Sequence, residues 1–406
     1  MLTRRGSFVC VASVGLAVAG RLLGIPELYS VAVVGLALVG AALLYVRHHP
    51  CHVQAERELR PPQVHADGSS RVELSLRNVD RGRSPVLSAR DPFDGGRRWA
   101  RFHVAPLEPG ETVRAAYRLP TAERGVFPLG PLQIDLVDPF GLAQRTTEAA
   151  PEAMLTVYPR VDDVHPLPQA RGSEPTGASG RPSLTVGGED FYALRPYQTG
   201  DDLRRVHWPA TARHDEVMIR QDEVPWQGRV TVLADLRASV HSPQSLELVL
   251  SAVASIIHAG WRDGRQIRLV ATDGTDTGFG SGHAHLAAIY EDLAVAESHG
   301  GDVRLPALLA SLDRKGGGGG VTLVSTDALA PEDLLALGRL GARVAPVILV
   351  IIERSAWDPT VADQPARRLP TATQVVRVSA GMSFAQAWDR AVPGPSRRHP
   401  ARAGER

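Results

Sequence analysis

The stretch Arg229-Val-Thr-Val-Leu-Ala-Asp235 decides the fold of the second half of this chain. It is a short apolar run that ends in an acid, a pattern typical of a strand buried on both faces of a parallel sheet. The region that follows, 244–259, has apolar residues at helical spacing, and 266–272 is a second apolar run of strand length. This alternation predicts an α/β domain.

The same alternation continues to residue 392. Strands are predicted over 321–326, 346–352 and 374–378, and helices over 284–296, 331–340 and 383–392. Pro331 occupies a favoured first helical position, and Gly341 follows the end of that helix. We therefore expect a doubly wound α/β domain over 229–392.

The region 51–165 has a different pattern. Residues 71–77, 112–119 and 132–137 alternate polar and apolar side chains, which predicts half-buried strands. Turn signals such as Asp94-Gly95-Gly96 separate these runs. We expect a small β-sandwich of immunoglobulin-like architecture, without the cysteine pair of that class.

The N-terminal region, 1–50, contains two apolar runs, 8–25 and 28–46, separated by Pro26-Glu27. A membrane span needs about 20 apolar residues. We expect a transmembrane helical hairpin. The alternative is that the first run is a cleaved signal peptide, but a small-x-small site is missing before Glu27 and a second span follows at once.

Basic residues flank the predicted hairpin on its outer ends. Arg4 and Arg5 precede the first run, and Arg47 follows the second. Positive flanks favour the cytoplasm. We therefore expect a multi-pass protein of the cell inner or plasma membrane whose soluble body is cytoplasmic.

Composition excludes several classes of protein. Hydrophobic residues make up 43% of the chain and charged residues 22%, which is typical of a globular protein. Lys and Arg number 45 against 44 Asp and Glu, so the basic excess of a nucleic-acid binder is missing and no nucleic-acid partner is expected. The two cysteines make neither a disulfide framework nor a zinc site. A linker is expected over 166–188 and a disordered tail over 393–406.

The segment 189–228 concentrates Arg, Asp and aromatic residues. Its notable residues are Arg195, Tyr197, Gly200, Asp201, Asp202, Arg204, His207, Trp208 and Arg213. The favoured interpretation is an internal brace in which Arg–Asp pairs and the Trp208 ring tie the segment to the sheet. The alternatives are a partner-binding surface, catalysis by Asp201 and His207, or contact with nucleic acid. Neither a nucleophile nor a metal constellation accompanies the acid–histidine pair, which disfavours catalysis.

These residues form a motif that resembles the signature of the domain-of-unknown-function 58 family. The motif is Arg195-Pro-Tyr197-x-x-Gly200-Asp201-Asp202-x-Arg204-x-x-His207-Trp208-x-x-x-Ala212-Arg213, accompanied by Arg124-Gly125, Asp138-Pro-Phe-Gly-Leu142 and Val157-Tyr-Pro159. The resemblance implies a membrane-anchored bacterial protein with a von Willebrand factor type A-like domain. It also implies a neighbouring MoxR-type AAA+ ATPase and, in some cases, transglutaminase-like membrane proteins.

The resemblance further implies a place for Mg²⁺, held by Asp-x-Ser-x-Ser after the first strand and by a later Thr and Asp. Here the first loop is Asp235-Leu-Arg237-Ala-Ser239, so Arg237 replaces the first serine. Asp327 matches the later acid, and no convincing Thr is found. We expect Arg237 to neutralise Asp235 and Asp327 in place of a metal, so that neither a metal nor a cofactor binds. The alternatives are bound Mg²⁺ or solvated loop residues. The pair His283-x-His285 has no acid at useful spacing, which favours a plain loop.

The expected function is that of a non-enzymatic membrane-anchored scaffold or partner-binding protein. Its expected partner is a MoxR-type AAA+ ATPase in bacterial envelope-related assembly. The alternatives are a metal-dependent hydrolase acting through Asp235 and Asp327, or a Mg²⁺-dependent adhesion module with its body outside the cell.

Overall fold

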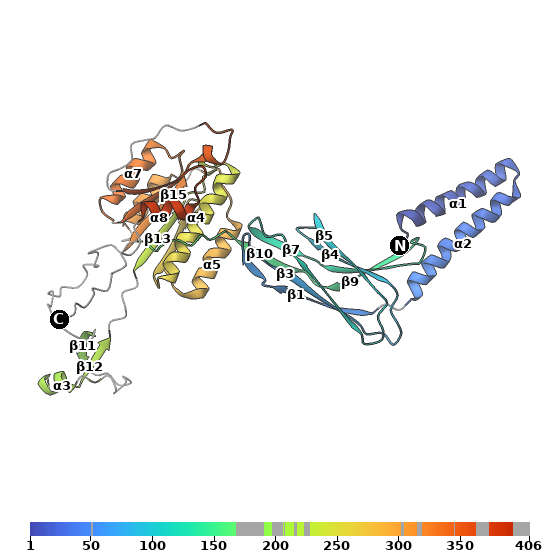
Figure 1. Ribbon diagram of the computed structural model, residues 1–406, viewed down its shortest axis with the longest axis horizontal. Coiled ribbons are helices and arrows are strands. Elements are labelled where there is room, and N and C mark those ends of the chain that lie inside the picture. The colour runs from blue at the N-terminus through green and yellow to red at the C-terminus, as the bar shows by residue number, and fades with distance from the viewer. Residues whose placement is uncertain are drawn as a thin grey trace, which may run out of the picture. The chain divides into compact units, whose positions relative to one another are not determined.

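The computed structural model describes residues 1–49, 52–167, 191–196, 206, 208–214, 217–222, 228–301, 304–314, 319–344, 346–362 and 373–392. These residues form two compact units (Figure 1). One unit is Met1–Arg160 with Tyr290–Ala296, and the other is Val161–Ile289 with Glu297–Arg406. The predicted linker from residue 168 onward and the predicted tail lie outside the described residues.

Two apolar helices begin the chain, as the sequence predicted. Helix α1 spans Arg4–Leu23, and helix α2 spans Pro26–His48. The Thr3 hydroxyl accepts a hydrogen bond from the N–H of Gly6 and so caps α1. Gly24, at φ 68°, ends α1 in the left-handed conformation that glycine favours. Both helices are long and apolar enough to cross a membrane.

A β-rich region follows the two helices. Its strands are β1 (Val53–Arg60), β2 (Gln63–His65), β3 (Arg71–Asn78), β4 (Leu87–Phe93), β5 (Arg98–Val104), β6 (Thr112–Arg118), β7 (Gly125–Leu129), β8 (Leu132–Val137), β9 (Gln144–Ala150) and β10 (Ala153–Tyr158). One sheet has the order β1-β3-β6. The other has the order β2-β10-β7-β4-β8-β9, with β5 paired to β4. The predicted strands at 71–77, 112–119 and 132–137 are confirmed as β3, β6 and β8.

Alternating side chains from both sheets form one apolar core in this region. Along β3 every second residue is buried, and Val72, Leu74 and Leu76 join Leu136 of β8 in the same cluster. Burial on one face and exposure on the other is the arrangement that the period-2 pattern encodes. The immunoglobulin-like architecture of the region stays a prediction.

A five-stranded parallel sheet forms the centre of the second unit. Its strands are β13 (Arg229–Ala234), β14 (Gln266–Ala271), β15 (Gly320–Thr326), β16 (Val347–Ile352) and β17 (Thr373–Val378), in the order β14-β13-β15-β16-β17. Every residue of β15 and β16 is buried, as expected for parallel strands covered on both faces. The predicted parallel α/β sheet is therefore confirmed.

Within the described ranges, five α-helices connect or follow the strands of this sheet. They are α4 (Pro243–Arg262), α5 (Gly282–Val295), α6 (Leu305–Arg314), α7 (Pro331–Gly341) and α8 (Phe384–Ala391). The sequence did not predict α6. Apolar side chains of α6 and α7 pack on β15 and β16 in one cluster, and α4 packs across β13, β14, β15 and β16.

The strand order reverses at β13. The chain leaves β13 for β14 on one side and then returns to place β15 on the other side. Helical connections that diverge in this way leave a crevice at the carboxyl ends of the two strands, where α/β sheets hold their ligands. The residues after β13 and β15 are therefore the first place to look for a site.

A separate small element lies within the signature segment. Strands β11 (Phe191–Pro196) and β12 (Met218–Asp222) pair as an antiparallel hairpin, and helix α3 (Trp208–His214) lies between them in the sequence.

Candidate functional site

The candidate site is built around Asp235, the residue that follows β13. Its backbone N–H donates to the carbonyl of Val324 at 3.1 Å, which fixes it beside the end of β15. The Asp235 side chain is 0% exposed. A carboxylate held this deeply needs a positive partner, because burying an unpaired charge is costly.

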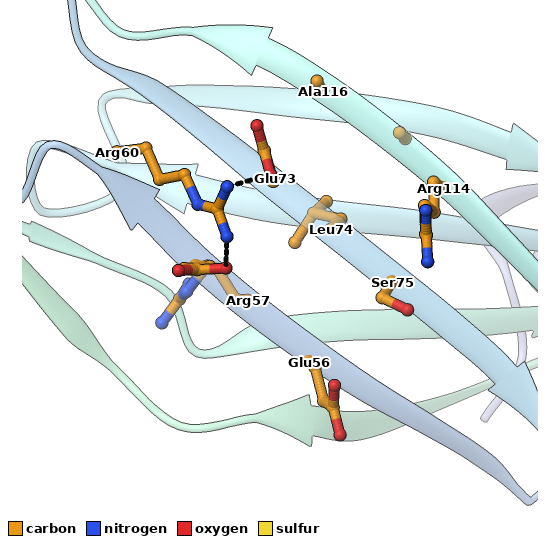
Figure 2. Close-up of a pocket in the computed structure, with 10 residues that line it drawn as sticks. Glu56, Arg57, Arg60, Glu73, Leu74, Ser75, Arg114 and Ala116 are labelled. Atoms are coloured by element: carbon orange, nitrogen blue, oxygen red, sulfur yellow. Dashed lines mark hydrogen bonds and ion pairs between the residues drawn. The ribbon is translucent and has the colours of Figure 1, made fainter.

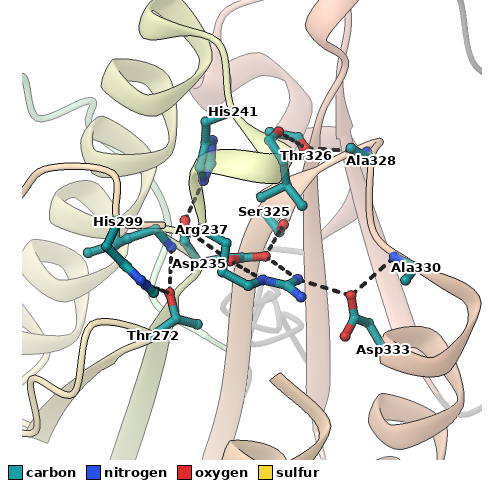
Figure 3. Close-up of polar contacts among 12 residues, drawn as sticks. Asp235, Arg237, His241, Thr272, His299, Ser325, Thr326, Ala328, Ala330 and Asp333 are labelled. Atoms are coloured by element: carbon teal, nitrogen blue, oxygen red, sulfur yellow. Dashed lines mark hydrogen bonds and ion pairs between the residues drawn. The ribbon is translucent and has the colours of Figure 1, made fainter. Parts of the chain in front are cut away.

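Arg237 supplies that positive charge. Its Nε lies 2.9 Å from Asp235 Oδ1 and its Nη2 lies 2.8 Å from Asp235 Oδ2, a bidentate pair (Figure 3). The same Nη2 donates to Asp333 Oδ2 at 2.9 Å. Asp333 lies in the first turn of α7, and its side chain is 1% exposed. One guanidinium therefore bridges two buried carboxylates, and its hydrogen bonds to Asp235 raise the pKa of Arg237 above its ordinary value.

Other donors occupy more of the two carboxylates. The hydroxyl of Ser325 donates to Asp235 Oδ2 at 2.7 Å, and the N–H of Ala330 donates to Asp333 Oδ2 at 3.1 Å. The Ala330 contact also satisfies an N–H group at the start of α7. Asp333 Oδ1 is buried without a hydrogen-bond partner among the described residues. The acids are thus held mainly by fixed neighbours from β15, α7 and the loop after β13.

Two histidines and a threonine hold the loop itself. His241 Nε2 donates to the carbonyl of Asp235 at 2.5 Å. Thr272 Oγ1 accepts the N–H of Leu236 at 2.8 Å and lies 3.0 Å from His299 Nε2. Burial lowers the pKa of His241, and the positive charges of Arg237 and Arg354 act in the same direction. The hydrogen bond from the His241 ring to the Asp235 carbonyl positions the loop.

Asp327 has a different partner from the one that the sequence predicted. We expected Arg237 to neutralise both Asp235 and Asp327. Instead, Arg354 Nε donates to Asp327 Oδ1 at 2.9 Å, while Arg237 turns to Asp333. Arg354 lies directly beyond β16, so it follows the strand next to β15 and reaches Asp327 across the edge of the sheet. Sequence analysis missed both Arg354 and Asp333.

The expected ligand set does not fit Mg²⁺. Arg237 covers both oxygens of Asp235, and Arg354 occupies Asp327. Ser239 is exposed in the short helix Ala238–Val240. A guanidinium on the carboxylate repels a divalent cation from the oxygens that it would need. Thr272, directly after β14, also lies at this edge, and the Leu236 N–H and the His299 ring already occupy its hydroxyl.

The histidines 283 and 285 serve separate structural contacts. His285 Nε2 lies 3.0 Å from the carbonyl of Ile267, and the His283 ring packs against Trp261 at a centroid distance of 4.7 Å. Across the described ranges, His, Cys, Asp and Glu side chains form no group of three that could hold a metal ion.

The signature residues are only partly described. Arg195 lies in β11 opposite Ile219 of β12, and Trp208 and Arg213 lie in α3. The predicted residues Tyr197, Gly200, Asp201, Asp202, Arg204 and His207 lie outside the described residues. The Trp208 side chain is 70% exposed. This ring is therefore largely exposed, and the brace interpretation of the segment stays a prediction.

A hollow of about 780 Å³ lies on the β1-β3-β6 sheet. Its charged lining residues include Glu56, Arg57, Glu58, Arg60, Glu73 and Arg114 (Figure 2). Arg60 pairs with Glu58 at 2.6 Å and lies 3.6 Å from Glu73. Arg60, Glu58 and Glu73 are partly or largely exposed and balance one another's charge, so this cluster needs no ligand to neutralise it.

A buried ion pair lies within the same region. Arg57 Nη1 donates to Asp91 Oδ1 at 2.7 Å, and Tyr117 Oη donates to Asp91 Oδ2 at 2.7 Å. Burial and the charge of Asp91 raise the pKa of Tyr117 above its ordinary value. The cluster therefore gives the buried Asp91 carboxylate two donors inside the β-rich region.

Comparison with known proteins assigns part of this chain to a family. Residues 193–375 match the family model described as "Protein of unknown function DUF58". Residues 193–375 of this chain are a DUF58 region. The match begins in β11 and ends in β17, so it covers the signature segment and the whole edge of the sheet around Asp235. No curated protein matches the DUF58 chain.

Several solved structures are similar to parts of the DUF58 chain. The CARDB domain of PF1109 from Pyrococcus furiosus is 15% identical, over 26% of this chain and 92% of that one, with a TM-score of 0.21. The β-glucosidase EmGH1 from Erythrobacter marinus is 15% identical, over 26% and 15%, with a TM-score of 0.19. The alkylpurine DNA glycosylase AlkC from Pseudomonas fluorescens is 9% identical, over 32% and 38%, with a TM-score of 0.19. Similarities this weak assign neither a fold nor a function.

Proposed function

We propose that this DUF58 protein is a non-enzymatic, membrane-anchored partner-binding protein. Its α/β domain is of the von Willebrand factor type A kind, and it engages a protein partner at the carboxyl edge of the sheet without a bridging metal. The proposed partner is a MoxR-type AAA+ ATPase, acting in envelope-related assembly. The bridge from Arg237 to Asp235 and Asp333 carries the proposal.

The type A assignment is supported by where the acids lie. Asp235 follows the first strand of the sheet, and Asp327 follows β15, the strand beside it. These are the two places where the resemblance puts metal ligands. Arg237 and Arg354 pair with the two acids, so the edge has the layout of such a site with arginine in place of the ion.

The same pairing favours binding over hydrolysis. A metal-assisted hydrolase needs an ion with an open coordination position, or a free acid that can accept a proton. Here both acids are held by guanidinium groups, and His241 donates to a backbone carbonyl. Buried ion pairs of this kind fix the loops at the edge of the sheet, which suits a protein partner because the loops are ordered before the partner arrives.

The membrane assignment is supported by the surface of the two N-terminal helices. Phe8 and Leu22 of α1 and Val34 of α2 are all exposed, so apolar side chains face outward along both helices. An exposed apolar surface of this length is stable when lipid covers it. The basic residues at the two outer ends favour a hairpin with both ends in the cytoplasm, and thus a multi-pass inner or plasma membrane protein with a cytoplasmic body.

Co-purification from membranes tests the proposal. The full chain is expected to recover a MoxR-type ATPase encoded beside it, in at least one nucleotide state. The variant Ser239→Arg, which adds a long charged side chain to the edge, is expected to lose that partner. Arg339→Glu, at the far end of α7, is the control and should retain it. Failure of the full chain to recover the ATPase in any nucleotide state would overturn the proposed partner, and equal recovery by Ser239→Arg would overturn the proposed surface.

A further inference from the structure

We propose that the turn Asp138-Pro139-Phe140-Gly141-Leu142 is a lipid-contacting element that lies in the phospholipid headgroup layer. Within this element, called here the 138–142 turn, Phe140 contacts lipid, and the neighbouring arginines of α1 pair with lipid phosphates. The proposal rests on the membrane anchoring proposed above and extends it from the helices to the β-rich region.

Asp138 closes the turn on itself. Its Oδ1 accepts the N–H of Phe140 at 2.9 Å, and its Oδ2 accepts the N–H of Ala143 at 2.5 Å. Its own N–H donates to the carbonyl of Ala143 at 3.1 Å. Gly141 has a φ of 70°, a conformation that side chains disfavour. Both oxygens of the buried Asp138 carboxylate therefore accept hydrogen bonds inside the turn, so this negative charge does not face lipid phosphates.

The turn is docked onto the first residues of α1. The N–H of Thr3 donates to the carbonyl of Leu142 at 2.9 Å, and the Thr3 hydroxyl donates to the carbonyl of Gly141 at 2.6 Å. At Gly6 a Cβ atom would lie 1.9 Å from the carbonyl oxygen of Leu142. Only glycine permits this approach, so the backbone of the turn touches the helix directly.

The end of α2 holds the other side of the turn. Leu142 and Ala143 are buried in a cluster with Val39, Ala42 and Val46 of α2. Arg145, just after the turn, donates from Nη2 to the carbonyl of His49 at 3.1 Å. The outer ends of both helices are thus tied to one loop of the β-rich region, within the same compact unit.

Helix geometry sets the depth of the turn. Gly6 is the third residue of α1, so at 1.5 Å per residue it lies about 3 Å from the start of that helix. The headgroup layer is roughly 5–7 Å thick on each side of the hydrocarbon core. Because α1 has 20 residues and is about 30 Å long, as thick as the hydrocarbon core, Leu142, which touches Gly6, lies at the boundary between that core and the headgroup layer when α1 spans the bilayer.

The residues around the turn suit that layer. The Phe140 side chain is 64% exposed, although it is two residues from the buried Leu142. Aromatic side chains are enriched at this depth in membrane proteins. Arg4 and Arg5 are exposed beside the turn, and a Cβ at Gly141 would lie 4.0 Å from Arg5 Nη1. An apolar ring flanked by guanidinium groups matches an acyl boundary covered by phosphates.

Fluorescence quenching in vesicles tests the proposal. In the full chain with Cys10→Ser and Cys51→Ser, Phe140→Cys carries an environment-sensitive fluorophore. The protein is reconstituted in phosphatidylcholine–phosphatidylglycerol vesicles that contain headgroup spin-labelled lipid. The emission at 140 is expected to shift to the blue and to fall severalfold.

Two further labelled variants make the outcomes distinct. Met154→Cys is the control. Met154 is exposed and lies in β10, opposite Pro128 of β7. Strand β8 begins just after β7, and the 138–142 turn follows the opposite end of β8. The emission of Met154→Cys should not change. Val34→Cys reports the middle of α2. Quenching of Val34→Cys by acyl-chain-labelled lipid, with position 140 behaving like position 154, would overturn this inference and leave the membrane anchoring intact. An unquenched Val34→Cys would overturn both.

Discussion

Replacing Arg237 with methionine removes the guanidinium that bridges Asp235 and Asp333 and keeps much of its apolar stem. Both carboxylates then stay buried without their positive partner. Removing one partner of a buried ion pair costs about 3–5 kcal/mol. The Ser325 hydroxyl and the Ala330 N–H remain as donors, so we expect the lower end of that range, about 3 kcal/mol of the free energy of unfolding.

Thermal unfolding of the full chain measures this loss. The α/β domain from Arg229 to Val392 has 392 − 229 + 1 = 164 residues. For a domain of this size each kcal/mol shifts the melting temperature by about 2–4 °C, so the Arg237→Met domain should melt about 6–12 °C lower. Hydrogen exchange at the amides of β13 and β15 should show the same loss and assign it to this domain.

The matched control is Arg377→Met. Arg377 pairs with Glu353 at 3.6 Å, and the two side chains are 37% and 31% exposed. Solvent screens such a pair, so its loss should cost less than about 1 kcal/mol. The reasoning is refuted if Arg237→Met and Arg377→Met melt alike, since the buried carboxylates would then need no guanidinium.

Three further outcomes are expected. Calorimetric titration of the wild type with millimolar Mg²⁺ should show no saturable binding, because a divalent ion about 4 Å from Arg237 is opposed by about 8 kcal/mol at an effective dielectric constant of 20. The variant Arg237→Ser should gain affinity for Mg²⁺. Micromolar Mg²⁺ binding by the wild type would contradict this reasoning. His241 has a pKa below its ordinary value of about 6.5, so the unfolded state takes up its proton first as the pH falls. The free energy of unfolding should therefore decrease as the pH falls below about 6.5 and through the folded pKa, and His241→Gln should flatten that dependence in melts across the range. Trp208→Ala should change the melting temperature little, because the ring is exposed and such surface changes stay within about 0.5 kcal/mol; a loss of several kcal/mol would support the brace interpretation.

Much of the fold could be predicted because the burial of a strand shows in its own short run of apolar residues. The runs at 229–235, 321–326 and 346–352 are mostly apolar, and they form neighbouring parallel strands. Helix α6 was missed because ten residues carry only a short periodic pattern, although Pro306 at its second position was a usable signal. Several short strands of the β-rich region, such as β5, are half exposed and alternate too weakly to stand out from turns.

The candidate site was predictable only where it is local. Arg237 lies two residues from Asp235, so the sequence itself brought them together. Asp333 lies 96 residues from Arg237, and only the packing of α7 beside the sheet brings it to the guanidinium. In the sequence, Asp333 looks like an ordinary acid in the first turn of a helix, where negative charge is favourable anyway. Arg354 was hidden in the same way, because only the adjacency of β15 and β16 places it beside Asp327.

The place of β13 in the sheet also sets an order of events during synthesis. It is the first strand of its domain to leave the ribosome, yet its neighbour β15 begins 320 − 229 = 91 residues later. At a synthesis rate of about 5–20 residues per second, the β15 edge of β13 stays unpaired for about 5–18 s. Through that interval Asp235 and Arg237 are already adjacent, while Asp333 has yet to be made. The N-terminal helices and the β-rich region have already been synthesised by then. One edge of β13 therefore stays unpaired while the chain is already linked to helices α1 and α2.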